Sequence, residues 1–191
     1  DVSNACLGLL NGVVQVANMI ELGQIRAGVV VGTESSRALV ESTIAQLNTD
    51  MSLSRNSVKP AFASLTIGSA SAAIVLVHRA LSRSGNRLLG GVAGAATEFC
   101  HLCRGGRDGA AEASTGPLMD TDSETLMREG VAVAKTTFAR FCDVLGWQPG
   151  DIDKTFCHQV GRAHQKLLLD TLGLDAAVDY ANERTAFGRK I

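Results

Sequence analysis

The stretch that decides the fold is SNACLGLLNGVV, residues 3–14, in which Cys6 precedes a long uncharged run. No charged side chain occurs between residues 5 and 20, and this composition predicts a helix buried on all sides. A cysteine in its first turn lies near free backbone N–H groups and the positive end of the helix dipole, which favour a thiolate. Cys6 is therefore a candidate nucleophile. The alternative, an inert cysteine packed as a small hydrophobic residue, fits Cys6 alone equally well.

A second candidate is His158. Residues 153–157, DKTFC, predict a short strand that leads into His158, and residues 163–169, AHQKLLL, predict a helix. This places His158 at the carboxyl end of a strand, where α/β sheets bind ligands. A lone histidine there is more often structural. Paired with a cysteine at an equivalent strand-to-helix turn, it becomes a candidate base or oxyanion donor.

Helical and strand patterns alternate along the rest of the chain. Apolar, β-branched runs at residues 27–34 and 70–77 predict interior strands covered on both faces, and a further strand is expected at residues 88–96. N-cap candidates at residues 120–123 precede a predicted helix over residues 124–145, which a glycine ends. The alternation predicts an α/β fold.

Five motifs, taken in order, resemble those of a known family. Two of them are similar to the nucleophile and histidine motifs of thiolase-fold condensing enzymes of the ketoacyl-ACP synthase III branch: NACLG at residues 4–8 and CHQVGR at residues 157–162. Three others fit the same branch: KPAFASLTIGS at residues 59–69, AATE at 95–98 and MREGVA at 127–132. The motif at 59–69 most resembles proteins that condense two fatty acyl-CoA molecules head to head in olefin biosynthesis.

The resemblance implies a thiolase-like fold of two related α/β halves, with mixed sheets and buried helices, incomplete at both ends. Residues 1–80 would be the remainder of the first half, with the nucleophile, and residues 81–87 a connection. Residues 88–174 would be the second half, with the histidine. Residues 175–191 would be an atypical tail.

The implied activity is that of an acyltransferase, a 3-oxoacyl synthase III-like enzyme that forms a β-keto product from acyl thioesters by Claisen condensation. Such an enzyme serves fatty acid or long-chain hydrocarbon metabolism. Cys6 would carry the acyl group, and His158 would donate a hydrogen bond to the enolate oxygen of the second substrate. No cofactor and no metal are expected. The expected partners are acyl-CoA or acyl carrier protein, and a second copy in a homodimer.

Parts of the sequence depart from the family pattern. The family has an asparagine after the histidine in a Gly-Asn-Thr context, but Asn182 is the only asparagine after His158 and does not fit. The carboxylate base of olefin-pathway relatives, which the partner subunit contributes, would lie before Asp1, and residues 176–191 resemble a segment of acyl-CoA dehydrogenases. The alternative function is therefore an inactive truncated or chimeric fragment that keeps the fold as a binding or structural module.

Composition narrows the remaining classes. A net charge of −1 gives no electrostatic case for nucleic acid binding. No uninterrupted apolar run reaches the roughly 18 residues of a transmembrane helix. Five cysteines at irregular spacing favour a reducing compartment, and hence the cytoplasm, over a disulfide framework. The pair Cys100 and Cys103 with His101 between them makes a zinc site a minor alternative, because a structural site needs further ligands.

Overall fold

The computed structural model describes residues 1–105, 119–158 and 160–180. The chain divides into two compact units: unit 1 contains residues 1–89 and 104–121, and unit 2 contains residues 90–103 and 122–191. Helices and strands are mixed along the chain, which confirms the α/β class expected from the sequence. Within the described ranges, no helix is long and apolar enough to cross a membrane.

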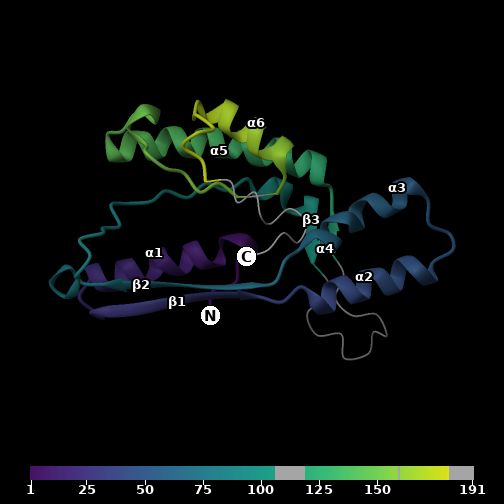
Figure 1. Ribbon diagram of the computed structural model, residues 1–191, viewed down its shortest axis with the longest axis horizontal. Coiled ribbons are helices and arrows are strands. Elements are labelled where there is room, and N and C mark those ends of the chain that lie inside the picture. Colours follow the sequence, from purple (N-terminus) through teal and green to yellow (C-terminus); the bar gives the residue numbers. More distant parts are fainter. Residues whose placement is uncertain (106–118, 159, 181–191) are drawn as a thin grey trace. The chain divides into compact units, whose positions relative to one another are not determined.

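Unit 1 contains an antiparallel pair of long strands with a helix against it. Strand β1, Ala27–Glu34, pairs with β2, Ala70–Val77, and Ala27 lies opposite Val77 (Figure 1). Both strands have the bounds expected from their β-branched runs. Helix α1, Gly8–Glu21, contacts both strands.

Glycines allow α1 to approach β1 closely. A Cβ atom added to Gly12 on α1 would lie 2.6 Å from Cγ1 of Val30 on β1. In the reverse direction, a Cβ added to Gly28 on β1 would lie 2.6 Å from Cγ1 of Val16 on α1. Each valine therefore fills the space that a glycine leaves open on the facing element.

The expectation that α1 is buried on all sides and that β1 and β2 are covered on both faces is wrong for the described residues. Alternate strand residues point to opposite faces, and α1 covers only the face that includes Gly28 and Val30. On the other face, Val29, Val31 and Val75 are 60%, 62% and 65% exposed. Apolar residues of α1 that face away from the strands are exposed as well: Leu10 and Val14.

The remaining elements of unit 1 are short apart from α2, Arg37–Thr49. They are α3 Arg55–Val58, α4 Phe62–Thr66, β4 Met119–Thr121, and the 3₁₀ turns η1 Ala5–Leu7, η2 Lys59–Ala61 and η3 Arg79–Leu81. Strand β4 pairs with β3, Cys103–Gly105. Ser64 of α4 is fully buried, and its hydroxyl donates a hydrogen bond of 3.1 Å to the carbonyl oxygen of Met119, which joins α4 to β4.

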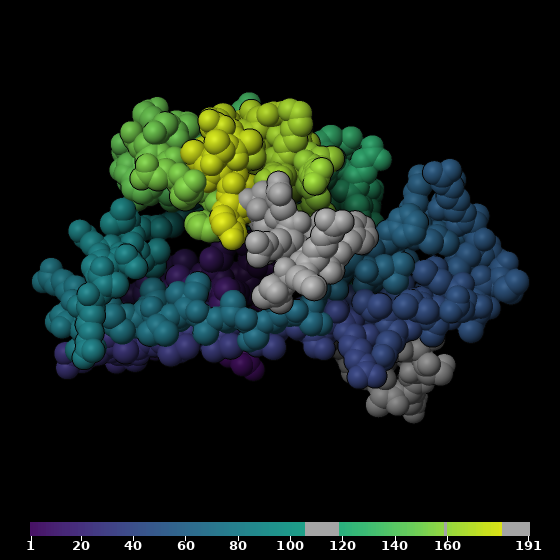
Figure 2. Space-filling model, viewed as in Figure 1, coloured from purple at the N-terminus to yellow at the C-terminus, as the bar shows by residue number. Residues whose placement is uncertain are grey.

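Unit 2 contains two helices that lie side by side, α5, Ser123–Leu145, and α6, Arg162–Leu172 (Figure 1, Figure 2). Helix α5 confirms the expected long helix. The Asp122 carboxylate accepts a hydrogen bond of 3.1 Å from the Thr125 backbone N–H and caps its start. Gly146 ends it with a φ of 68°, a left-handed conformation that glycine adopts readily. Two 3₁₀ turns complete the unit: η4 Thr97–Leu102 and η5 Pro149–Asp151.

The strand expected at residues 88–96 is not formed. Part of this segment lies against α5 instead, because a Cβ on Gly90 would meet the Leu145 side chain at 3.1 Å and one on Gly94 would meet that of Thr137. A strand needs a partner strand for its backbone N–H and C=O groups. The glycines of this segment serve close approach to a helix rather than pairing.

Candidate active site

Cys6 lies in η1, one turn before α1 begins at Gly8, and it is exposed. Cys6 was expected in the first turn of the helix, but it lies in a tighter 3₁₀ turn that leads into the helix. The Leu7 N–H donates a hydrogen bond of 2.9 Å to the carbonyl oxygen of Asn4, which closes the turn. The Asn4 side chain donates a hydrogen bond of 2.7 Å to Oδ1 of Asn11, so the segment before Cys6 is tied to α1.

The residue before Cys6 has an unusual backbone conformation. Ala5 has a φ of 42°, and it is the only non-glycine residue with a positive φ among the described residues. A residue with a Cβ atom disfavours this region by about 1–2 kcal/mol. Strain of this kind often marks functional sites, because the surrounding structure must hold it. The conformation of Ala5 changes the chain direction directly before Cys6, the candidate nucleophile.

His158 lies in an exposed segment between a single β-bridge and α6. The strand expected over residues 153–157 is reduced to one parallel bridge, Thr155 with Asp179. The Thr155 N–H donates to the Val178 carbonyl, and the Tyr180 N–H donates to the Thr155 carbonyl, both at 2.9 Å. The segment that carries His158 therefore has the expected order, extended chain, histidine and then helix.

A second histidine lies near His158 within unit 2. Burial lowers the pKa of His164, and the neighbouring charge of His158 lowers it further. Nδ1 of His164 is buried and has no hydrogen-bond partner among the residues that the structure describes. His164 lies on α6, in the first turns after the segment that carries His158.

The Asp179 carboxylate, which the sequence analysis did not single out, contacts the segment that precedes His158. Asp179 is 9% exposed and accepts hydrogen bonds from the Thr155 hydroxyl at 2.8 Å, the Cys157 N–H at 3.2 Å and the Gln165 side chain at 2.7 Å. Burial alone would raise the pKa of Asp179, but the hydrogen bonds from Gln165, Thr155 and Cys157 hold it below its ordinary value. No local pattern singles out Asp179, because its burial depends on residues far away in the sequence.

None of the five cysteines, which all lie among the described residues, forms a disulfide bond. Burial and the Asp179 carboxylate raise the pKa of the Cys157 thiol to about 11. Cys6, Cys100 and Cys103 are exposed. Within the described part of the chain, no group of three or more His, Cys, Asp or Glu side chains could hold a metal ion.

The two candidate catalytic residues belong to different units, Cys6 to unit 1 and His158 to unit 2. Their roles stay predictions, as do the domain boundaries expected from the sequence. Residues 175–180 of the expected tail lie in unit 2, where they include the bridge to Thr155. Gln159, Asn182 and the rest of the tail, residues 181–191, lie outside the described residues.

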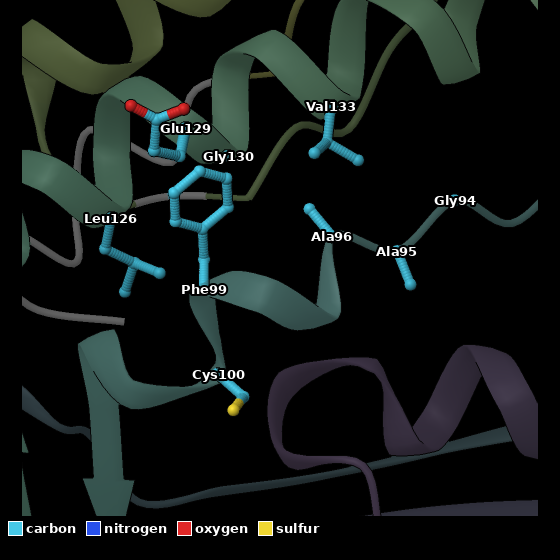
Figure 3. Close-up of a pocket in the computed structure, with 9 residues that line it drawn as sticks. All are labelled: Gly94, Ala95, Ala96, Phe99, Cys100, Leu126, Glu129, Gly130 and Val133. Carbon is cyan, nitrogen blue, oxygen red and sulfur yellow. The ribbon is translucent and has the colours of Figure 1, made fainter.

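Unit 2 also has a cavity of about 240 Å³ between η4 and α5 (Figure 3). Its lining is mainly apolar, and the Phe99 ring points towards α5. One carboxylate, that of Glu129, and one thiol, that of Cys100, belong to the lining. Neither Cys6 nor His158 lines this cavity.

Similarity to known proteins identifies the fold. No family model matches the sequence. The acyl-CoA:acyl-CoA alkyltransferase of Shewanella oneidensis is 38% identical over 177 residues, which cover 91% of this chain and 50% of that protein. The chain spans about half the length of the curated relatives it matches.

Solved structures agree with this similarity. The OleA protein of Xanthomonas campestris with bound cerulenin superposes with a TM-score of 0.84 at 32% identity, over 95% of this chain and 50% of that one. A cysteine-to-serine variant of the same protein, with bound lauric acid and lauroyl-CoA, superposes with a TM-score of 0.81 at 32% identity, over 94% of this chain and 50% of that one. The expected thiolase-like α/β fold is thereby confirmed. The homologues of this chain are thus acyl-CoA:acyl-CoA alkyltransferases, which are thiolase-fold, head-to-head condensing enzymes, and the chain matches about half of one of them.

Proposed function

We propose that this chain belongs to an acyltransferase that joins two acyl-CoA molecules by Claisen condensation to a β-keto product. The observation that carries the proposal is Cys6, an exposed thiol at the start of α1 in a chain 38% identical to an acyl-CoA:acyl-CoA alkyltransferase. In the first step, the Cys6 sulfur attacks the thioester carbonyl of one acyl-CoA. The C–S bond to coenzyme A breaks, coenzyme A leaves as a thiol, and the acyl group stays on Cys6.

His158 is proposed to act in the second step. A general base takes a proton from the carbon next to the thioester carbonyl of a second acyl-CoA, and this proton later returns the departing Cys6 thiolate to the thiol. The resulting enolate attacks the Cys6 thioester. A hydrogen bond from His158 to the enolate oxygen would stabilise the developing charge. The new carbon–carbon bond forms as the Cys6 sulfur leaves, which regenerates the thiol. Solved variants of the Xanthomonas protein include substitutions of a cysteine and of a histidine, in keeping with these two roles.

Acyl-CoA is favoured over acyl carrier protein as the substrate. The support is the bound lauroyl-CoA of the Xanthomonas protein, whereas no comparison points to a carrier protein. The five cysteines at irregular spacing fit a reducing compartment, and we propose on that ground that the protein is cytoplasmic. Fatty acid or long-chain hydrocarbon metabolism is the corresponding setting.

A homodimer is also proposed. The bare valine face of β1 and β2, which includes Val29, Val31 and Val75, is a surface that association could cover. Sedimentation of the purified chain over a range of concentrations tests this. A monodisperse monomer at every concentration would count against the homodimer.

Acylation of Cys6 tests the activity directly. The purified chain is incubated with lauroyl-CoA, quenched in acid, digested and mapped by mass spectrometry. We expect one lauroyl group on the peptide that contains Cys6, release of an equal amount of coenzyme A, and no acylation of a Cys6→Ala variant. Acyl transfer without any β-keto product would limit the chain to the first step. Absence of acylation in a chain that is folded by circular dichroism would overturn the proposal and favour a binding or structural module.

A further inference from the structure

The Asp179 carboxylate accepts hydrogen bonds from partners that lie on two sides of the His158 segment. Its Oδ1 accepts from the Thr155 hydroxyl and from the Cys157 N–H, and its Oδ2 accepts from the Gln165 side chain. Cys157 directly precedes His158, and Gln165 lies near the start of α6. One carboxylate thus ties the beginning of the segment to the helix that ends it.

Asp179, Cys157 and Gln165 form a hydrogen-bonded group at a buried position, here named the clasp. Asp179 is only 9% exposed, and each carboxylate oxygen has a donor. Hydrogen bonds to a charged acceptor are stronger than those between neutral groups, and a buried carboxylate without them is costly. The β-bridge with Thr155 fixes the backbone of Asp179 from the other side.

His158 itself is exposed, so burial does not hold it in place. His164 on α6 has a buried Nδ1 without a hydrogen-bond partner among the described residues, so this atom does not restrain the His158 segment. The clasp is the contact that restrains the chain immediately before His158.

We propose that Asp179 is a positioning residue for His158, which acts by holding Cys157 and Gln165 together across the segment that carries the histidine. The proposal rests on the role proposed above for His158, but its geometric part stands without that role. Asp179 lies too far along the chain, beyond α6, to have been associated with His158 from the sequence pattern.

Three variants test the clasp. Asp179→Ala removes both acceptor oxygens, and with them the contacts to Thr155, Cys157 and Gln165. Asp179→Asn keeps one oxygen acceptor and loses the other. The double variant Asp179→Asn with Gln165→Glu restores the missing contact with its direction reversed, because the new amide can donate to the new carboxylate. Asp170→Ala is the matched control, since Asp170 lies on α6, is exposed and pairs only with Lys166 among the described residues.

The first readout needs no activity. Side-chain NMR of histidine and hydrogen exchange of the Cys157 amide are followed in the full 191-residue chain. In Asp179→Ala we expect the Cys157 amide to exchange about tenfold faster or more, and the His158 ring signals to shift towards averaged values. Amides in the middle of α6, at Leu168 and Leu169, should keep their protection. The double variant should recover the Cys157 protection, and Asp170→Ala should match the unmodified chain.

Unchanged His158 signals and Cys157 exchange in folded Asp179→Ala would overturn the proposal. If Asp179→Ala does not fold, Gln165→Leu decides, because it removes only the contact with α6, and unchanged His158 signals and Cys157 exchange in that variant would overturn the proposal as well. The second readout is kinetic. Condensation should fall about tenfold or more in Asp179→Ala, while lauroyl transfer to Cys6 stays within about twofold. Loss of lauroyl transfer in the unmodified chain would sink the proposed function, and the NMR result would still decide on the clasp.

Discussion

Gly12 of α1 and Val30 of β1 fit together so closely that the glycine has no room for a side chain. The 2.6 Å separation between an added Cβ and Val30 Cγ1 is far below van der Waals contact. Gly12→Ala must therefore move α1 away from the strands or force Val30 into another rotamer. We expect a loss of about 1–3 kcal/mol in the free energy of unfolding, measured by urea denaturation.

The matched control for this prediction is Gly130→Ala on α5. In the part of the chain that the structure describes, no neighbouring atom lies within 4 Å of a Cβ added to Gly130. Alanine in a helix interior is favoured over glycine by about 0.5–1 kcal/mol, so this variant should be neutral or more stable. Equal destabilisation by both substitutions would contradict the account of the interface between α1 and β1.

Because Ala5 has a positive φ, two substitutions at this position should differ in their effect on stability. Ala5→Gly removes the steric cost of this conformation and should leave the free energy of unfolding within about 1 kcal/mol of the original. Ala5→Val adds a β-branched side chain, which is least compatible with a positive φ. It should lower stability and change the rate of Cys6 alkylation, measured with iodoacetamide. If Ala5→Val matches Ala5→Gly in both the free energy of unfolding and the rate of Cys6 alkylation, the positive φ of Ala5 does not constrain the turn.

The thiols should differ in reactivity. We expect limiting iodoacetamide near pH 7 to modify Cys6 first and Cys157 last, as measured by peptide mapping. Cys157 is protected because burial and the Asp179 carboxylate raise its pKa to about 11, so almost none of it is thiolate at neutral pH. Cys100 and Cys103, which are exposed and outside the turn that carries Cys6, are the internal comparison. Modification of Cys157 ahead of Cys6 in folded protein would refute this order.

The depressed pKa of Asp179 predicts a loss of stability in acid. A carboxyl group with a pKa below its unfolded value of 3.8 stabilises the fold above that value and loses this contribution as the pH falls through its folded pKa. Urea midpoints measured from pH 6 down to pH 3 should therefore fall, and fall less steeply in Asp179→Asn. Asp170→Asn, at an exposed ion pair, should keep the slope of the unmodified chain.

His158→Ala should separate the two chemical steps. If His158 stabilises the enolate, lauroyl transfer to Cys6 should persist while formation of the β-keto product falls about a hundredfold or more. Product is measured by mass spectrometry and acylation by peptide mapping. His101→Ala is the control, because the His101 ring is exposed and its Nδ1 lies 3.1 Å from the nearby carbonyl oxygen of Glu98. Equal loss of both steps would assign His158 to activation of the thiol instead.

Local sequence patterns predicted the elements whose ends carry their own signals. The bounds of β1 and β2 follow from apolar, β-branched runs. Helix α5 follows from the cap at Asp122 and the left-handed Gly146. In these places the residues that fix the structure lie within or beside the element itself.

Features that depend on distant residues were not predictable. Whether both faces of β1 are covered depends on what packs against it, and Val31 looks the same in the sequence whether buried or exposed. The segment around Gly90 reads as a strand, but its neighbour is α5. Cys6 and His158 were suggested by resemblance to a family. The role of Asp179 depends on its bridge to Thr155, a contact between distant residues that the sequence does not reveal.

The pairing of β1 with β2 sets the order in which unit 1 can fold. Helix α1 and β1 are neighbours in the chain, so their contacts close a short loop. The partner strand β2 arrives only after the whole of α2, α3 and α4, and its backbone hydrogen bonds require closure of a much longer loop. We therefore expect α1 and β1 to form the early nucleus, and β2 to join in the slow step that makes folding cooperative.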